Sequence, residues 1–362
     1  MYTYILKRLL LSIPMLIGIT FISFLVMQLA PGEVAGGPGG EMSASRMTRD
    51  QRRIMNETFH LDQPIYLRYF YWLGVLQAQP SKETLMQWQD EDAERAKENL
   101  PAKSRLRGLI FGDFGYSMET HSITVWERLR DAIPVTLMLN ILGFFAIYLS
   151  AIPIGIYSAT HPYNALDRLT TIGMFVLYSL PGFWVAIMMI LFMVSLPPQW
   201  RLPFNGIEPI GADRLPTLTY FWECAKHLVL PVIAMSYGGI AGLSRYMRVG
   251  MIDVIRSDYI RTARAKGLPE FLVTYKHALR NSLIPVITIL GGELSGMLGG
   301  SVILETIFGI HGMGYIGYNA LLARDYTLLM ADLTISSVLV MAGFLLSDLL
   351  YVMVDPRISF ES

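Results

Sequence analysis

The chain has 362 residues, of which 53% are hydrophobic and only 16% charged, and its mean hydropathy is +0.42. Soluble domains usually carry about 25% charged residues, so this deficit indicates that lipid solvates much of the chain. The formal net charge of zero gives no global sign of nucleic acid as a partner, and the single cysteine, Cys224, excludes an intramolecular disulfide and a cysteine-based metal cluster.

Six apolar stretches reach or approach the roughly 20 residues that a membrane-spanning helix needs. They are Leu9–Leu29, Val135–Tyr157, Thr171–Leu196, Leu228–Leu243, Ser282–Ile303 and Asp332–Val354. They are too long for soluble strands and do not alternate with period two. The first is longer than the apolar region of a signal peptide, and the sequence Ala30-Pro31-Gly32 behind it suits cleavage poorly. We therefore predict an all-α membrane protein with six transmembrane helices, the first of them uncleaved within residues 1–29.

Positive charge in short loops predicts the orientation. Bases outnumber acids between Arg245 and Arg280, so the loop 245–280 is predicted to be cytoplasmic, whereas residues 305–330 hold one base, Arg324, and are predicted to be external. Both chain ends then lie inside (N-in/C-in), with 134–354 as the membrane core of helices two to six and 355–362 as a cytoplasmic tail.

Residues 30–133 are predicted to form a large external (periplasmic) region between the first two spans. Phe59–Leu76 is rich in tyrosine, phenylalanine and tryptophan, which is typical of a belt where rings meet lipid headgroups. The charged segment 77–108 is predicted to be a solvated insertion. It either contacts a binding protein or decorates the surface, and the sequence does not decide between the two.

The segment with the strongest chemical pattern is Ser257–Glu270, within the basic cytoplasmic loop. Asp258 suits a helix N-terminus, where a carboxylate opposes the dipole, and Gly267 is a natural C-terminal stop. Pro269 and Glu270 suit the first turn of a second helix. The pattern predicts a short helix, a sharp turn and another helix below the membrane.

One face of this short helix carries Tyr259, Ala263 and Lys266, which are spaced i, i+4 and i+7. Two interpretations fit a small exposed helix with alanine at its centre. It can enter a groove of another protein, where its arginines meet acidic groups, or it can lie on anionic lipid.

The segment resembles the EAA-loop signature of ABC importer permeases. Asp258 stands where that motif begins, Ala263 is its alanine and Gly267 its glycine. The run Asp258–Leu268, with His277-Ala278-Leu279-Arg280-Asn281 behind it, is similar to the dipeptide/oligopeptide permease family, B-type branch (DppB/OppB type). Further segments with the family's character are Ala30-Pro31-Gly32, Leu61–Ile65, Gly112–Ser117, Glu305–Phe308, Arg324–Tyr326, Asp348–Tyr351 and Asp355–Ile358. The tail Asp355–Glu361 is most similar to the YejB-like subgroup, which is associated with peptides and peptide-like microcins.

The resemblance implies an ABC type I importer permease fold in the bacterial inner membrane and a coupling helix that docks in a groove of a cytoplasmic ATPase. Arg261 and Arg264 are expected to contact that ATPase, while Tyr259 and Ala263 are expected to fill the groove. The implied ATPase-coupling residues are Asp258, Tyr259, Arg261, Ala263, Arg264, Lys266, Gly267 and Leu268.

The implied partners are a second homologous permease subunit, two cytoplasmic ABC ATPase subunits, an extracytoplasmic substrate-binding protein and membrane lipid. No cofactor or metal is expected on this chain, and ATP and Mg are expected to be used by the partner ATPase subunits. No lysine follows a glycine, so there is no Walker A loop, and neither a His-Glu-x-x-His helix nor a Gly-x-Ser-x-Gly elbow occurs. The chain is therefore predicted not to be an enzyme.

Candidate residues of a translocation pathway lie in and behind the fifth predicted span. Glu293 is an acidic group at a costly depth, so it either meets the cationic end of a substrate or is hydrogen-bonded to a neighbouring helix. The recurrence of Gly292, Gly296 and Gly300 either lets helices pack closely or lines a wide route. The predicted pathway residues are Glu293, Ser295, Gly296 and Glu305. Asp348 is predicted to make a structural pairing.

The predicted function is import of peptides or peptide-like compounds by alternating access, driven by separate ATPase subunits. Related systems leave other solutes open within the same importer class: a nickel chelate, glutathione or a sugar. An ATP-independent channel and an intramembrane enzyme are the alternatives from other classes. Co-purification with nucleotide-binding subunits distinguishes the importer from a channel.

Overall fold

The computed structural model describes residues 2–29, 60–76, 82–97, 108–118, 123–209, 211–283, 286 and 301–354. In this part of the chain the regular structure is helical, and the β-structure consists of isolated bridges between Gly108 and Asp113 and between Tyr116 and Thr124. The chain forms two compact units. Unit 1 holds Met1–Arg8, Pro134–Tyr315 and Leu339–Ser362, and unit 2 holds Leu9–Ile133 and Ile316–Val338.

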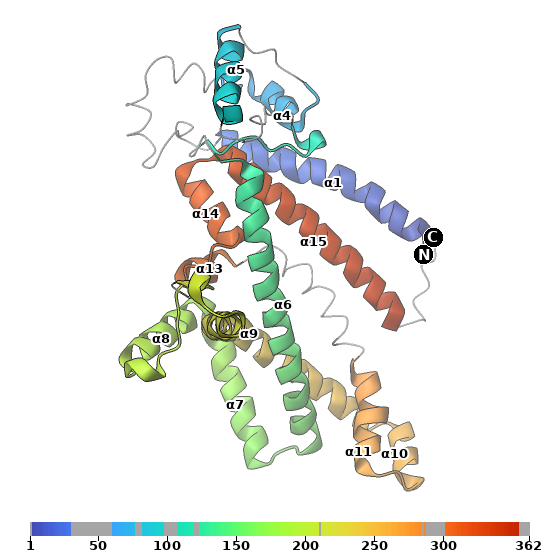
Figure 1. Cartoon of the computed structure of the whole chain (residues 1–362). Coiled ribbons are helices and arrows are strands. Elements are labelled where there is room, and N and C mark those ends of the chain that lie inside the picture. Colours follow the sequence, from blue (N-terminus) through green and yellow to red (C-terminus); the bar gives the residue numbers. More distant parts are fainter. Residues whose placement is uncertain are drawn as a thin grey trace. The chain divides into compact units, whose positions relative to one another are not determined.

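Four described helices are long and apolar enough to cross a membrane (Figure 1). They are α1 (Tyr2–Leu29), α6 (Val125–Thr160), α9 (Thr217–Ile255) and α15 (Tyr326–Val354). A fifth candidate span is the bent pair α7 (Ala165–Ser179) and α8 (Gly182–Ser195). The predicted span Ser282–Ile303 lies mostly outside the described residues, so the predicted total of six stays a prediction.

The third predicted span, Thr171–Leu196, is not one helix in the structure. It divides into α7 and α8, which meet at an angle of 105°. Pro181 occupies the N-cap of α8 and has no N–H to continue α7. The Tyr237 hydroxyl of α9 donates a hydrogen bond of 2.6 Å to the Leu180 carbonyl, which satisfies an acceptor exposed by the break.

The fourth predicted span, Leu228–Leu243, is much shorter than α9, which runs from Thr217 to Ile255. The apolar run measures only the part of a helix that lipid surrounds. The helix itself continues through polar flanks, because its backbone hydrogen bonds do not depend on side-chain polarity.

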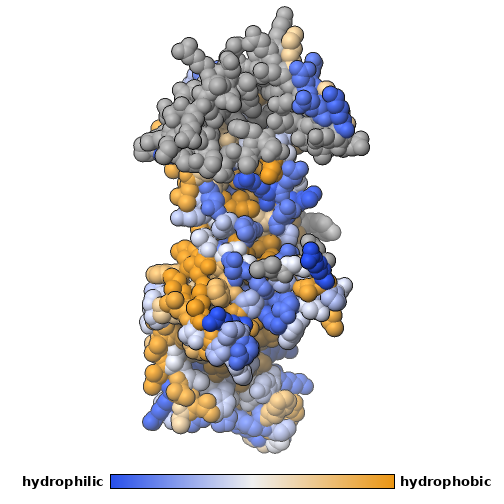
Figure 2. Space-filling view, turned by 60° about the vertical axis from the view of Figure 1, so that its left-hand side comes forward, coloured by the Kyte–Doolittle hydropathy of each residue, from blue (hydrophilic) through white to orange (hydrophobic). Residues whose placement is uncertain are grey.

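The remaining helical elements are short. They are α4 (Ile65–Leu73), α5 (Lys82–Lys97), η1 (Leu109–Phe111), η2 (Pro198–Trp200), η3 (Ala212–Arg214), α10 (Asp258–Ala265), α11 (Glu270–Leu272), the π-helical segment η4 (Val273–Ala278), α13 (Val302–Ile307) and α14 (Met313–Ala323). Apolar side chains also cover large areas of the surface shown in Figure 2, which is expected of a protein whose outer solvent is lipid.

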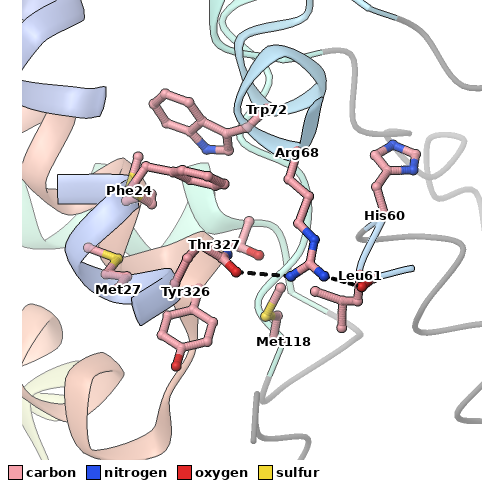
Figure 3. A pocket seen from close by; sticks show the side chains of 11 residues that line it. Phe24, Met27, His60, Leu61, Arg68, Trp72, Met118, Tyr326 and Thr327 are labelled. Carbon is pink, nitrogen blue, oxygen red and sulfur yellow. Dashed lines mark hydrogen bonds between the residues drawn. The ribbon is translucent and has the colours of Figure 1, made fainter. Parts of the chain in front are cut away.

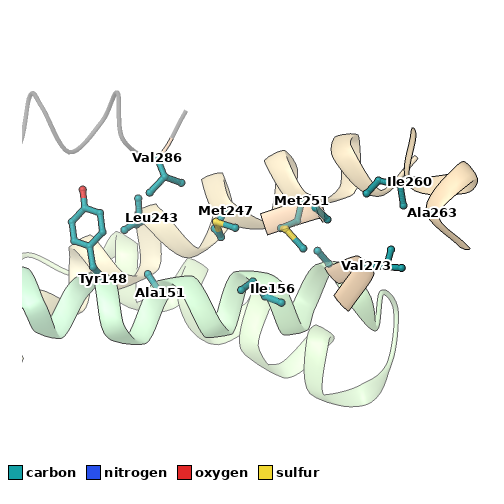
Figure 4. Close-up of a cluster of buried hydrophobic side chains, with 12 residues drawn as sticks. Tyr148, Ala151, Ile156, Leu243, Met247, Met251, Ile260, Ala263, Val273 and Val286 are labelled. Atoms are coloured by element: carbon teal, nitrogen blue, oxygen red, sulfur yellow. The ribbon is translucent and has the colours of Figure 1, made fainter. Parts of the chain in front are cut away.

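Two clusters of buried side chains lie in the described part of unit 1. In one of them α6 contributes Tyr148, Ala151 and Ile156, and α9 contributes Leu243, Met247 and Met251 (Figure 4). The two helices approach closely at Gly155, where an added Cβ would lie 2.5 Å from the Cβ of Met247. The second cluster holds Leu139, Ala186, Leu230, Ala234, Phe308 and Ile310.

The two ends of the chain contribute an ion pair to unit 1. Arg8 Nη2 lies 2.9 Å from Asp348 Oδ2. This contact joins the first turns of α1 to the last turns of α15. The predicted structural pairing of Asp348 is confirmed.

Unit 2 is built on the section of α1 that follows Arg8. α4 packs on it through Tyr69 and Trp72, whose side chains are buried. Beside them lies a small apolar pocket whose walls include Phe24, Met27 and Met118 (Figure 3). Helix α5 carries part of the predicted charged insertion, and Met86 on it is exposed.

Candidate functional site

The helix α10 begins and ends where local chemistry predicts. Ser257 is its N-cap, Asp258 stands in the first turn and Arg264 in the last, so both charges oppose the helix dipole. Gly267 follows the C-cap with φ +75°, the left-handed conformation that glycine adopts without strain. Pro269 is then the N-cap of α11. The predicted helix, sharp turn and second helix are confirmed.

The inner face of α10 anchors the helix to its own chain. Ile260 is fully buried and Ala263 is 7% exposed, and both pack in the cluster that continues through Val273, Ala278 and Met251. Figure 4 shows Ile260 and Ala263 at the end of the row of buried side chains that runs along α9. Movement of α10 must therefore be accompanied by movement of the helices that share this core.

The outer face of α10 is polar and open. Tyr259 is 44% exposed, and the Arg261 side chain is 72% exposed. Arg261 Nη1 lies 3.3 Å from Asp258 Oδ1, a surface pair that contributes little to stability. The Tyr259 hydroxyl accepts a hydrogen bond of 2.7 Å from Asn281 Nδ2. Tyr259 and Arg261 are thus displayed on a helix that its buried side holds in place.

The predicted common face of Tyr259, Ala263 and Lys266 divides in the structure. Tyr259 and Lys266 are exposed, whereas the Ala263 methyl group packs inside the chain. The groove-filling position expected for Ala263 is thereby corrected. The reason is that Ala263 lies between Tyr259 and Ile260 around the helix, and the fully buried Ile260 turns that side toward the core.

A clamp closes the turn between α10 and α11. Arg264 donates two hydrogen bonds to Glu270, of 3.1 Å from Nε and 2.6 Å from Nη2. These bonds lower the pKa of the Glu270 carboxyl below its usual value. In this structure the Arg264 guanidinium is therefore engaged by hydrogen bonds within its own turn. Leu268 lies half-buried beside the same cluster, and its N–H donates to the Ala263 carbonyl.

Glu305, a predicted pathway residue, is buried in unit 1 with only 3% of its surface exposed. Its Oε1 accepts from Thr136 Oγ1 at 3.2 Å and from the Ser301 N–H at 3.3 Å, and its Oε2 accepts from the Tyr315 N–H at 2.8 Å. The Thr136 hydroxyl oxygen in turn accepts from the Met313 N–H at 2.8 Å. This geometry accounts for the carboxylate as a structural acceptor, and the predicted contact with a transported solute stays a prediction.

The other predicted pathway residues, Glu293, Ser295 and Gly296, lie outside the described residues. The glycine recurrence at Gly292, Gly296 and Gly300 lies there as well.

An ion pair that the sequence did not predict joins α7 to α9. Arg248 Nη2 lies 2.8 Å from Asp167 Oδ2, and the Asp167 side chain is 3% exposed. The same oxygen accepts the Tyr163 N–H at 2.9 Å, and Asn164 caps the helix by accepting the Asp167 N–H. The spacing Asn164-x-x-Asp167 is a sequence signal for a helix start, but the partner lies 81 residues further on.

Replacing Asp167 by asparagine is expected to lower the free energy of unfolding by about 1–3 kcal/mol, because the Arg248 guanidinium loses its counter-charge in a partly buried site. Thermal unfolding of the purified complex in detergent would measure the loss. Asp253→Asn is the matched control, since Asp253 is exposed on α9. Equal midpoints for the two variants would contradict a stabilising role for the pair.

Comparison with known proteins gives one family. A family model described as "Binding-protein-dependent transport system inner membrane component" matches residues 151–360, which include α10 and Glu305. The oligopeptide transport system permease protein AppB of Bacillus subtilis is 35% identical over 360 residues, covering 99% of this chain and 100% of that protein. The dipeptide transport system permease protein DppB of Escherichia coli (strain K12) is 31% identical, with 99% of each protein covered.

The inner membrane ABC transporter permease protein YejB of Escherichia coli O157:H7 is 29% identical, with 100% of each protein covered. These identities do not single out one subgroup. Among solved structures, a chain of the inward-facing MetNI methionine ABC transporter aligns with a TM-score of 0.49 at 18% identity, over 63% of this chain and 97% of that chain.

Proposed function

Because this chain belongs to the family of binding-protein-dependent transport system inner membrane components, we propose that it is the permease subunit of an ATP-binding-cassette importer that moves peptides or peptide-like compounds into the cytoplasm. The protein resides in the bacterial inner membrane. The observation that carries the proposal is the family match over residues 151–360, together with relatives along the whole chain that are named as oligopeptide and dipeptide permeases.

In this proposal α10 is the point at which ATP hydrolysis by other subunits reaches the membrane helices. Tyr259, Arg261 and Lys266 contact a groove of the ATPase, which they are free to do because they are exposed. Ile260 and Ala263 carry the movement inward, since they share one core with α6 and α9. Because one face of α10 is exposed and the other is packed in the core, a movement of the bound ATPase can pass through α10 to the membrane helices.

The chain acts as half of a pathway that a second, homologous permease completes. Two ATPase subunits bind ATP and Mg, close, and drive alternating access, while an extracytoplasmic binding protein delivers the solute. This chain holds no nucleotide itself. We propose the same topology as the charge pattern predicts, with both chain ends and α10 in the cytoplasm.

Competition uptake tests the substrate class. The complex with its cognate subunits, reconstituted in proteoliposomes, should take up a labelled peptide that an unlabelled peptide library displaces. Displacement by a nickel chelate, glutathione or a sugar, and not by peptides, would favour the other solutes within the same importer class. Uptake without ATPase subunits would favour a channel.

The charge reversal Arg261→Glu tests the coupling. We expect uptake and binding-protein-stimulated ATPase activity to fall by about tenfold or more, because like charges brought together at an interface cost several kcal/mol. The fold should persist, since the Arg261 side chain is 72% exposed. Arg214→Glu, at another exposed arginine, is the matched control and should keep wild-type activity. Wild-type coupling in Arg261→Glu would remove Arg261 from the proposed contact.

A further inference from the structure

The short helix α4 packs along the second half of α1, where its contacts run from Ile17 to Gln28. The Tyr69 hydroxyl donates to the Ile17 carbonyl at 3.1 Å and lies 2.9 Å from Thr20 Oγ1, which is buried. The Tyr69 ring also meets Phe21 and Phe24, with ring centroids 5.2 and 5.5 Å apart. These contacts fix where α4 lies along α1, because they all fall on Ile17–Phe24.

This position corresponds to a depth within the bilayer. Ile17 precedes Leu29, the last residue of α1, by twelve residues, which is about 18 Å along a helix axis. Even a tilt of 40° leaves a depth of about 14 Å, in a hydrocarbon core about 30 Å thick. The apolar window of α1 runs from Ile5 to Leu29, so Ile17 is at its centre. Helix α4 therefore lies beside the part of α1 that lipid surrounds.

The face of α4 turned away from α1 is apolar and uncovered. Tyr66 is 65% exposed and Phe70 is 43% exposed. The adjacent turn η1 adds Ile110, which is 64% exposed, and Phe111, which is 58% exposed. Gly74 and Gly108 hold η1 against the end of α4, since a Cβ at Gly108 would lie 2.3 Å from Gly74 Cα. Phe21 of α1, whose ring contacts Tyr69, is itself 44% exposed, so the apolar surface continues from α4 onto α1.

The one cation of α4, Arg68, is hydrogen-bonded within the protein. Arg68 donates to Gln28 Oε1 at 2.9 Å, to the Gln63 carbonyl at 2.7 Å and to the Leu61 carbonyl. Figure 3 shows Arg68 pointing toward Leu61 at the pocket beside α1. These three hydrogen bonds pair three of the five N–H groups of the guanidinium, which lowers the cost of placing Arg68 next to lipid.

We propose that Tyr66, Phe70, Ile110 and Phe111 form a lipid-contacting face, seated in the leaflet at the C-terminal end of α1. The partner is the bilayer itself: acyl chains against the apolar rings, and the headgroup region against the tyrosine hydroxyl. Continuity with the lipid face of α1 favours a bilayer over a soluble protein. The predicted aromatic belt within Phe59–Leu76 would then contain a membrane-inserted helix, α4, which anchors the chain in the bilayer in addition to the spans.

Site-specific fluorescence tests this proposal in the complete transporter, reconstituted in nanodiscs of phosphatidylethanolamine and phosphatidylglycerol. In a Cys224→Ser background, Tyr66→Cys, Phe70→Cys and Phe111→Cys are each labelled with a nitrobenzoxadiazole probe. We expect emission at shorter wavelength and several-fold stronger quenching by doxyl-labelled lipid than by aqueous iodide. Ile22→Cys on α1, at 61% exposure, should behave in the same way.

Met86→Cys on the charged helix α5 is the matched control, because Met86 is 64% exposed, like Tyr66 at 65%. Its label should be quenched by iodide and not by doxyl lipid. If the labels at Tyr66, Phe70 and Phe111 behave like the label at Met86, the proposal is overturned. It is also overturned if they are shielded only after the binding protein is added, since the face would then dock a protein. The measurement needs neither substrate nor ATP, so its result is independent of the proposed transport function.

Discussion

Glu305→Ala is expected to destabilise the transporter severely and to abolish uptake. The buried carboxylate accepts hydrogen bonds from Thr136 and from the backbone N–H groups of Ser301 and Tyr315. Alanine leaves all of these donors without an acceptor, at about 1–3 kcal/mol for each buried group. Because the donors come from α6, from the start of α13 and from the start of α14, the loss should loosen the whole region and not one side chain.

The surrounding glycines leave no room for an alternative arrangement. A Cβ at Gly312 would lie 2.6 Å from Glu305 Oε2, and one at Gly314 would lie 3.1 Å from it. Glu305→Gln keeps the shape but turns an NH₂ group toward backbone donors, so we expect an intermediate loss of stability. The chain thus packs closely around the Glu305 carboxylate, and both of its oxygens accept hydrogen bonds.

Thermal unfolding of the purified complex measures the order: wild type, then Glu305→Gln, then Glu305→Ala as the least stable. Glu208→Gln is the matched control, since Glu208 is exposed and glutamine can still accept from Tyr220. A Glu305→Gln transporter of wild-type stability with changed selectivity between cationic and neutral peptides would support the pathway role and refute the structural one.

Gly267→Pro is expected to uncouple ATP hydrolysis from uptake. The Gly267 backbone has φ +75°, and its N–H donates to the Arg264 carbonyl at 2.9 Å. Proline sets φ near −65° and has no N–H, so the chain must leave α10 in another direction. Glu270 would then no longer meet Arg264, and the turn that holds the exposed face of α10 in place would open.

A graded series separates backbone conformation from bulk. Nothing lies within 4 Å of a Cβ placed at Gly267, so Gly267→Ala has room and costs only the left-handed conformation, about 1–2 kcal/mol. Asparagine tolerates that conformation better, so Gly267→Asn should be closest to wild type. Uptake and binding-protein-stimulated ATPase activity in proteoliposomes should fall in the order Asn, Ala, Pro. Wild-type coupling in Gly267→Pro would show that the turn does not transmit force.

Helix boundaries at α10 were predictable because they depend on neighbouring residues alone. Asp258 at the first turn, Gly267 behind the last turn and Pro269 before the next helix each act within a few residues of themselves. The bend between α7 and α8 was less predictable. A proline within an apolar run can either kink a helix or end it, and here Tyr237 on α9 takes up the carbonyl that the break exposes.

Contacts between distant residues were beyond the sequence. The hydrogen bond from Thr136 to Glu305 spans 169 residues, and the pair of Arg248 and Asp167 spans 81. From the sequence, each of these side chains is only a polar group near a predicted span. Its partner could be a solute, water or another helix. Only the packing of the helices selects one candidate.

The sequence by itself determined that lipid solvates much of the chain and that Ser257–Glu270 forms a short helix and a turn. It also carried the family resemblance that the comparisons then showed. These follow from composition and from interactions a few residues long. The tertiary structure alone decided which side of α10 faces inward, with Ala263 buried and Tyr259 exposed. It also decided that α4 lies along the second half of α1, because that depends on Tyr69 reaching the Ile17 carbonyl across 52 residues of chain.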